Sequence, residues 1–460
     1  MKRHHVFLLA VFAGLVSVAG VCAEEAPLRV ATFQADITPP LGSPLCHGNV
    51  PPAKKIVDPL SARGIIVITR QAPIVLCALD WVRISNSGYD AWVEALAEAV
   101  GTSRDRVSVH CVHQHDAPGI DFGTEKLLAA HGLGGQMFNV AAARDAIKRT
   151  AAAAGEAVKK SIRVTHLGYG MGKVEKVAST RRCMGPNGKV KRVRYSSCRN
   201  EAVRAEPEGP IDPYLRTISF WDGDRPLVAM SYYACHPQSY YGRGGVSHEF
   251  PGMARAAREA AVPGALQIYF DGAGGNIAAG KYNDGSVPVR AILARRLEKG
   301  MKAAWDSTKK ISVAAADVSW RTRQVQLPIR KTMNEATSLR ELENTSLPLR
   351  KRMFGARFTV WIRRVKSGQP IQLSCLRVGP AYVLHMPGEL FVEYQLAAQK
   401  MRPDDFVCMA AYGEGGPGYI GTKIAYGQGG YETSARASLV TPEVEDVLMP
   451  AMRYLLGVKH

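Results

Sequence analysis

His113 and His115 have side chains that can ligate a metal ion, and they lie where a predicted strand ends. Residues 106–111 alternate in a way that predicts a strand, and the Ala-Pro-Gly that closes residues 112–119 forces a turn. The carboxyl end of a strand is where α/β sheets usually hold ligands. An extended segment directs two side chains that are one residue apart to the same side. This spacing suits metal binding, although two hydrogen-bonded surface histidines would give the same pattern.

Three more polar residues come after apolar strand-like segments, next to a Pro or Gly break. They are His236, Glu389 and Tyr419. If these strand ends meet at one edge of a sheet, imidazoles, a carboxylate and a phenol converge on one point. Zinc accepts His and carboxylate ligands, and a catalytic zinc site keeps one position for water. Each residue alone has an ordinary explanation, as a turn histidine, a helix-start glutamate or a packed tyrosine, but their recurrence favours a zinc site.

The segments around these residues resemble motifs of the neutral/alkaline (non-lysosomal) ceramidases. Five segments carry the resemblance in collinear order: Ala-Asp-Ile-Thr-Pro-Pro at 35–40, His-Gln-His-Asp-Ala-Pro-Gly at 113–119, Cys-His-Pro at 235–237, Pro-Gly-Glu at 387–389, and Gly-Tyr-Ile at 418–420 followed by Tyr-Glu at 431–432. The resemblance implies zinc ligands at His113, His236, Glu389 and Tyr419. It also implies hydrolysis of an amide by zinc-activated water.

The same resemblance implies roles for residues beside the metal. His115 would lie behind the ligands or transfer a proton there. Tyr431 would hydrogen-bond in the same pocket. A functional arginine of the family falls at Arg181 or Arg182, and Arg182 is our candidate catalytic arginine.

The chain departs from the family at the catalytic serine. Residues 275–278 match the segment that holds it and place Ala278 at that position, so no hydroxyl is available there to attack or to stabilise an oxyanion. Asn276 can take part of this role, and Asp271 adds an acid at the preceding strand end. The chain ends about 40 residues after Tyr419, so we expect the family's C-terminal immunoglobulin-like domain to be absent, which weakens the case for ceramide as substrate.

The N-terminus predicts export. A basic start, an apolar segment and a small-residue cleavage site ending at Ala23 indicate a signal peptide over 1–23. We therefore expect the mature chain to be exported, to the periplasm or out of the cell. Disulfides are allowed in such a compartment, and Cys183 and Cys198, which flank a basic loop, are the favoured pair. The chain has no CxxC motif, which argues against a thiolate zinc site.

The net charge of +19 favours anionic partners, such as an anionic membrane or envelope surface. Nucleic acid is not expected, because an exported chain without a nucleic-acid-binding module gives no support for it. Residues 328–368 are rich in Arg and Lys, with Phe354, Phe358 and Trp361 interleaved, and predict a basic helical insertion. Its aromatic residues either form an amphipathic surface for lipid or pack on the body of the protein, and we favour packing.

Strand-like and helical segments alternate along the rest of the chain without a long linker. Helices are expected at 89–100, 139–160, 252–261, 289–305, 390–401 and 441–456, hairpins at 216–235 and 371–386, a strand at 406–412 and paired strands at 311–327. This pattern predicts an α/β fold with mixed central sheets flanked by helices, in a single large catalytic domain over 24–460.

The functional prediction is an exported zinc-dependent hydrolase that cleaves an amide (N-acyl) or related bond in a small-molecule or lipid-like substrate. The alternative is a catalytically silent metal-binding or envelope-associated binding protein, which the alanine at position 278 favours. The sequence makes no prediction of the oligomeric state.

Overall fold

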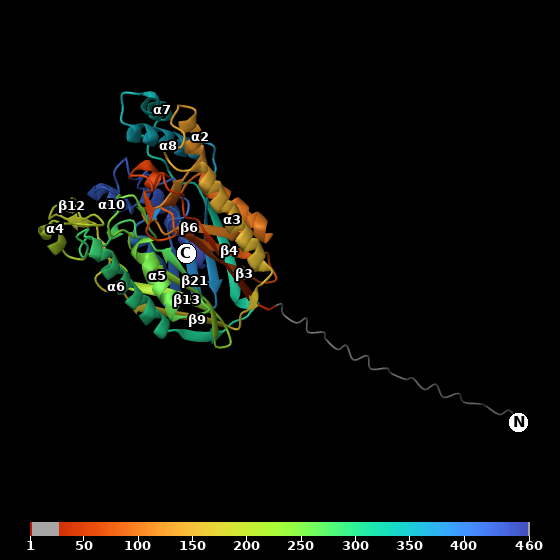
Figure 1. The fold of residues 1–460 in the computed structure, drawn as a ribbon. Helices are drawn as coiled ribbons and strands as arrows, with labels where there is room; N and C mark the ends of the chain where they lie inside the picture. The colour runs from red at the N-terminus through yellow and green to blue at the C-terminus, as the bar shows by residue number, and fades with distance from the viewer. Residues whose placement is uncertain (2–26, 459–460) are drawn as a thin grey trace.

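The computed structural model describes Met1 and residues 27–458, so the predicted signal peptide lies, apart from Met1, outside the described residues. Three sheets of four or five strands form the body, and helices cover their outer faces (Figure 1). The predicted mixed α/β architecture is therefore confirmed. In the described part of the chain, no helix is both long enough and apolar enough to cross a membrane.

The first sheet has five strands in the order β6-β4-β3-β1-β8. Its strands are β1 (Arg29–Asp36), β3 (Ser61–Ile68), β4 (Ile74–Leu79), β6 (Val107–Cys111) and β8 (Ile162–Arg163). The neighbouring β4 and β6 are parallel. Two helices, α1 (Ser87–Val100) and α3 (Val140–Val158), pack on this sheet, and both lie close to their predicted positions.

The second sheet has the order β16-β14-β13-β9-β18. Its strands are β9 (His166–Lys173), β13 (Tyr214–Asp222), β14 (Arg225–Tyr233), β16 (Leu266–Asp271) and β18 (Lys309–Ser312). The predicted hairpin is the antiparallel pair β13 and β14, and β14 is also parallel to β16. The helices α5 (Glu249–Ala261) and α6 (Val287–Asp306) pack on the sheet and on each other (Figure 1).

The third sheet has the order β19-β20-β21-β23. Its strands are β19 (Val318–Val325), β20 (Ile371–Val378), β21 (Ala381–His385) and β23 (Phe406–Ala410), with α9 (Val392–Met401) and α11 (Val444–Leu456) packed against them. The prediction of paired strands at 311–327 is wrong. A 3-10 turn at Ala315–Asp317 moves the chain to another sheet, so β18 pairs with β9 and β19 pairs with β20.

The three sheets share one apolar core. It contains side chains from the first, second and third sheet in turn, among them Ile65, Leu76, Phe220, Met230, Val383 and Cys408. Burial of such side chains is the main stabilising contribution to the fold. Because the sheets meet there, the ends of β16, β6 and β23 also lie close together, and the loops that follow central strands share one region.

The predicted helical insertion between β19 and β20 consists of α7 (Glu335–Glu343) and α8 (Leu349–Lys366). The helix α8 packs on α2 (Phe122–Ala129) (Figure 1). Trp361 is buried, and Phe354 and Phe358 are partly buried, so these aromatic side chains pack on the protein, as we favoured.

The remaining elements are short and form the loops around the sheet ends. They are β2 (Lys55–Ile56), β5 (Arg83–Ile84), β7 (Gly119–Ile120), β10 (Ser179–Thr180), β11 (Arg182–Met184), β12 (Val190–Val193), β15 (Gly245–Val246), β17 (Ile277–Ala278), β22 (Glu389–Leu390), β24 (Tyr419–Ile420), α4 (Glu201–Ala205), α10 (Lys423–Gln428) and the 3-10 turns at Cys46–Gly48 and Arg104–Arg106. The expected disulfide is not formed, since Cys183 and Cys198 are both free thiols. The thiol of Cys198 instead lies 3.6 Å from the backbone oxygen of Asn200.

Candidate metal centre

Four loops that follow central strands bring polar side chains to one point. His113 follows β6, His236 follows β14, Glu389 follows β21, and Tyr419 follows β23. Glu389 and Tyr419 are direct partners in the parallel pair of β22 and β24. The polar side chains at these strand ends therefore lie together in the structure, as the sequence predicted.

His113, His236 and Glu389 form a buried group that could hold a metal ion. One ligand atom from each residue lies within 4.8 Å of the others. Oε2 of Glu389 is 3.3 Å from Nε2 of His113 and 3.1 Å from Nε2 of His236. The hydroxyl of Tyr419 is 3.1 Å from the same nitrogen of His236, which places the predicted fourth ligand beside the group.

The hydrogen bonds of His113 and His236 determine which ring nitrogen of each imidazole could bind a metal ion. Nδ1 of His113 lies 2.6 Å from the backbone oxygen of Val82, and Nδ1 of His236 lies 2.7 Å from that of Gly274. A carbonyl can only accept, so each Nδ1 carries the proton and each Nε2 presents a lone pair. Nε2 of His113 is buried and has no hydrogen-bond partner. Two lone pairs thus face a carboxylate, and a cation would remove this repulsion.

The protonation states at the centre suit metal ligands, which must be deprotonated. Burial lowers the pKa of His236 to about 4, so this imidazole is neutral near pH 7. Burial opposes the ionisation of Glu389, but the ion pair with the Arg83 guanidinium favours the carboxylate form. Arg83 forms an ion pair with Oε1 of Glu389, which leaves Oε2 to face the two imidazoles.

The arginine at the centre is Arg181, and the choice of Arg182 as catalytic arginine is corrected. Nη1 of Arg181 donates to the Tyr419 hydroxyl at 2.9 Å and lies 3.3 Å from Nε2 of His236. Arg182 instead donates to the backbone oxygen of Ala425 at 3.0 Å. Both guanidinium groups lie near the buried Glu432 carboxylate, at 3.0 Å for Arg181 and 3.5 Å for Arg182, but of the two only Arg181 also contacts His236 and Tyr419.

His115 and Tyr431 lie at the cavity next to the metal centre. The His115 ring is 5.3 Å from that of His113, and its Nδ1 is buried without a hydrogen-bond partner. The Tyr431 ring is 5.7 Å from that of Tyr419. Both side chains therefore line the cavity beside the candidate ligands, and their roles stay predictions.

Asn276 and Asp271 do not line this cavity. The Asn276 amide donates to Glu393 at 2.9 Å, and its oxygen accepts from the backbone of Val392 at 2.9 Å. Asp271 is buried and accepts from the backbone of Cys235 at 3.3 Å. Both residues therefore support the turns around His236 and do not contact the space where a substrate would bind.

The position of the missing serine is next to the centre. Ala278 is fully buried and forms an isolated bridge with His236, and its carbonyl accepts from the Ser179 hydroxyl at 2.8 Å. The alanine side chain supplies no hydroxyl at this position.

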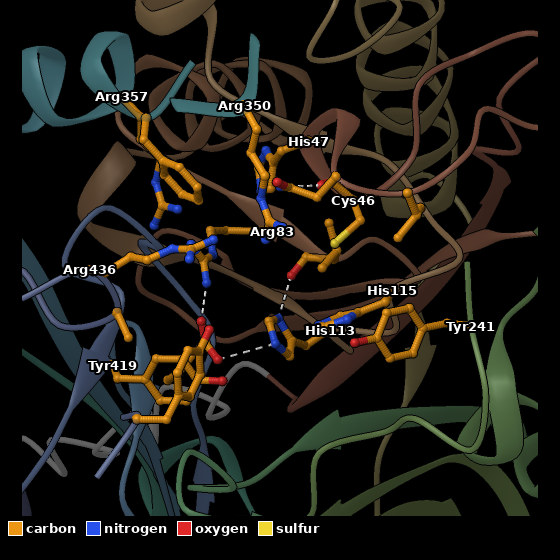
Figure 2. Close-up of a pocket in the computed structure, with 17 residues that line it drawn as sticks. Cys46, His47, Arg83, His113, His115, Tyr241, Arg350, Arg357, Tyr419 and Arg436 are labelled. Carbon is orange, nitrogen blue, oxygen red and sulfur yellow. Dashed lines mark hydrogen bonds and ion pairs between the residues drawn. The ribbon is translucent and has the colours of Figure 1, made fainter. Parts of the chain in front are cut away.

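The cavity in front of the centre has a volume of about 270 Å³. Most of the residues around it were not predicted. They include Cys46, His47, Arg83, Tyr241, Arg350, Phe354, Arg357 and Arg436 (Figure 2). Burial raises the pKa of Cys46 to about 12, so this thiol is protonated and is a poor nucleophile.

Several residues around the centre have positive φ angles, which side-chain-bearing residues rarely adopt. The angles are 48° at Cys46, 55° at His47, 75° at His113 and 60° at Tyr412. The Tyr412 ring stacks on His113 at 4.6 Å, a contact that the sequence gave no means to predict. Backbone strain of this kind is concentrated at functional sites.

Solved structures of ceramidases have the same fold. The structure of neutral ceramidase from Pseudomonas aeruginosa matches with a TM-score of 0.67 and 17% identity, over 95% of this chain and 74% of that one. A ceramidase complexed with C2 matches with a TM-score of 0.67 and 17% identity, over 94% and 75% of the two chains. No family model matches the sequence, and the search of curated proteins found no match to it. The chain therefore has a ceramidase-like fold, as the sequence motifs predicted.

Proposed function

We propose that this chain with a ceramidase-like fold is an exported zinc-dependent hydrolase of an amide (N-acyl) or related bond. The observation that carries this proposal is the buried group of His113, His236 and Glu389, with unprotonated nitrogens facing a carboxylate. Three protein ligands with histidine and carboxylate donors are typical of catalytic zinc sites. The substrate would be a small or lipid-like molecule that enters the cavity beside this group.

The residues around the centre can serve the hydrolysis. A bound zinc ion would polarise the scissile carbonyl and lower the pKa of water. Arg181 pairs with Glu432 at 3.0 Å and donates to the Tyr419 hydroxyl, so the arginine and the phenol form a fixed donor group beside His236. Such preorganised donors stabilise negative charge that develops on a carbonyl oxygen. His115 has an unpartnered ring nitrogen at the cavity, where it can accept or return a proton.

A catalytically silent metal-binding protein is the second candidate. The buried Ala278 favours it, because the position next to His236 lacks a hydroxyl. The net charge of +19 supports contact with an anionic envelope surface in either case. The hydrolase and the silent protein would both bind a metal ion, and they differ only in whether a substrate is turned over.

The first test is metal content. Purified protein should contain about one zinc per chain, as three-ligand sites do. The His113→Ala and Glu389→Ala variants should lose the metal. His131→Ala is the matched control, since His131 follows α2 and does not line the cavity. Folded protein that takes up no zinc would contradict both candidates.

The second test is turnover across a panel of N-acyl amides and esters, including a short-chain fluorescent ceramide. Release of the acyl group by the zinc-loaded protein, and not by the His113→Ala variant, supports the hydrolase. Full zinc occupancy without turnover on any member supports the silent binding protein.

A further inference from the structure

Four arginines from three separate parts of the chain line the cavity of the metal centre. Arg83 lies on β5, Arg350 and Arg357 lie on α8, and Arg436 lies in the loop between α10 and α11 (Figure 2). Among the described residues that line the cavity, Glu389 has the only carboxylate, and it is paired with Arg83. The cavity is thus strongly cationic even before a divalent metal ion is counted.

The other three arginines have no carboxylate within ion-pair distance among the described residues. The guanidinium carbons of Arg350 and Arg436 lie 5.7 Å and 5.0 Å from the centre of the Phe354 ring. Arg357 is partly buried, and burial together with the charge of Arg83 lowers its pKa to about 9. A partly buried guanidinium close to a second one is unfavourable unless an anion lies near both.

His47 is the second observation that indicates a ligand. Its side chain is only 9% exposed and lines the cavity, yet neither ring nitrogen has a hydrogen-bond partner. Buried polar groups are normally hydrogen-bonded, and an exception calls for a ligand or water. The ring is held by close packing, because a Cβ built on Gly119 would lie 2.4 Å from Cε1 of His47.

His47 and two of the arginines surround a common space. A recess of about 20 Å³ is lined by His47, Arg350, Phe354 and Arg357, which also line the main cavity. A volume of this size holds one small polar group. Arg350, Phe354 and Arg357 have the spacing i, i+4 and i+7, so one face of α8 presents them to the recess.

We propose that the substrate carries an anionic group, a carboxylate or a phosphate, close to the bond that is cleaved, and that Arg350, Arg357 and Arg436 bind this group together with His47. This proposal rests on the proposed function, because it takes from it that the chain cleaves an amide or related bond in the substrate. Guanidinium groups bind carboxylate and phosphate through paired, charge-assisted hydrogen bonds. The anion would neutralise charges that no protein carboxylate neutralises. Ceramide, which is uncharged and carries two long hydrocarbon chains, fits this cavity poorly.

The experiment compares two pairs of probes that differ in charge. N-butanoylglycine is paired with neutral N-butanoylglycinamide, and phosphorylated N-butanoylethanolamine is paired with its neutral alcohol. Equilibrium binding is measured by calorimetry on metal-depleted protein, and turnover is measured on zinc-loaded protein. We expect the charged member of at least one pair to bind about tenfold or more tightly, as charge-assisted hydrogen bonds give. The pair that shows the preference identifies carboxylate or phosphate, and added salt should reduce the preference.

Substitutions locate the effect. Arg357→Gln and Arg436→Gln should each reduce the charged-to-neutral affinity ratio several-fold, about 1 kcal/mol. Arg363→Gln is the matched control, because it removes the same charge from the same helix at an exposed position outside the cavity. Thermal unfolding verifies that each variant is folded. If neither cavity variant folds, the salt dependence of the charged-to-neutral affinity ratio of the wild-type protein decides whether charge drives the preference.

The failures of the two proposals can be told apart. Equal binding of the charged and neutral members of both pairs overturns the anion site, whatever the turnover. Charge-dependent binding without turnover of any probe overturns the hydrolase and leaves the anion site standing.

Discussion

Arg83 pairs with one oxygen of the Glu389 carboxylate, while the other oxygen faces His113 and His236. A single buried carboxylate thus serves both the metal group and the nearest arginine of the cavity. This arrangement fixes the orientation of Glu389, because ligating carboxylates are normally held by hydrogen bonds from outside the metal. It also links metal binding to the charge of the substrate cavity.

Glu389→Gln should therefore weaken zinc binding strongly. Glutamine keeps the size of the side chain but replaces an anionic ligand with a neutral amide, and Arg83 loses its counter-ion. We expect zinc affinity, measured by competition with a chelator, to fall at least about 100-fold, or about 3 kcal/mol. The Glu259→Gln variant breaks another arginine pair, with Arg63, and should leave zinc affinity unchanged. Unaltered zinc affinity in Glu389→Gln would contradict the ligand assignment.

Arg181 and Arg182 offer a matched pair for testing the arginine at the centre. Arg181→Met removes the donor to Tyr419 and should lower kcat about 100-fold, as loss of one preorganised donor does. Arg182→Met removes the donor to the Ala425 carbonyl and should affect thermal stability more than kcat. Steady-state kinetics on the probe with the fastest turnover compare kcat in the two variants. A larger loss of kcat in Arg182→Met than in Arg181→Met would reverse our assignment.

Gly119→Ala should disturb the cavity without removing a polar group. The new Cβ would lie 2.4 Å from Cε1 of His47 and 2.7 Å from Cγ1 of Val82, whose carbonyl holds His113. Overpacking of this kind costs about 1–3 kcal/mol in the free energy of unfolding. We also expect weaker binding of the charged probes. Gly427→Ala is the control, since no atom lies within 4 Å of its Cβ position.

His110 should make stability depend on pH. Burial lowers the pKa of its imidazole to about 4, against 6.5 for the unperturbed group. The unfolded chain therefore binds this proton first as the pH falls below about 6.5, and stability is lost between about pH 6.5 and pH 4. From pH 6.5 to pH 5 the loss from one such group is roughly 2 kcal/mol. His236, with a pKa of about 4, contributes in the same direction in metal-free protein.

Denaturant unfolding of metal-free His110→Asn at pH 7.5 and pH 5 measures this effect. The variant should lose less stability than the wild-type protein between the two pH values, whatever its absolute stability. His131→Asn controls for removal of a histidine elsewhere. An equal loss in His110→Asn and the wild-type protein would show that His110 is not the group responsible.

The metal group could be predicted from the sequence because its residues share a local signal. Each of His113, His236 and Glu389 lies just after an apolar strand and near a Pro or Gly break, and strand ends meet at one edge of a sheet. The choice between Arg181 and Arg182 failed because Arg181 lies in a bend between β10 and β11, and the sequence does not show which of the two side chains turns toward the centre. Tertiary packing determines which arginine reaches the centre, and the local sequence pattern does not show it.

The cationic cavity could not be predicted, because its residues come from segments with no common pattern. The face of α8 with Arg350, Phe354 and Arg357 was visible in the spacing, but a basic helix is usually a solvated one. Cys46 and His47 lie in a 3-10 turn with positive φ angles, which no residue preference indicates. The pairing of 311–327 failed for a similar reason, since the turn at Ala315–Asp317 directs the chain to a second sheet.

The insertion that carries α8 joins β19 to β20, which are antiparallel neighbours and pair along their whole length. The pairing of these strands does not require a connection of any particular length or composition. The metal group, in contrast, is built on loops of the central strands. Changes at the cavity-facing positions of α8 would therefore alter which molecules fit the cavity without replacing His113, His236 or Glu389. Trp361 packs on Gly416 and Arg364 lies 3.8 Å from Glu414, so α8 and the loop that precedes Tyr419 would have to be exchanged together.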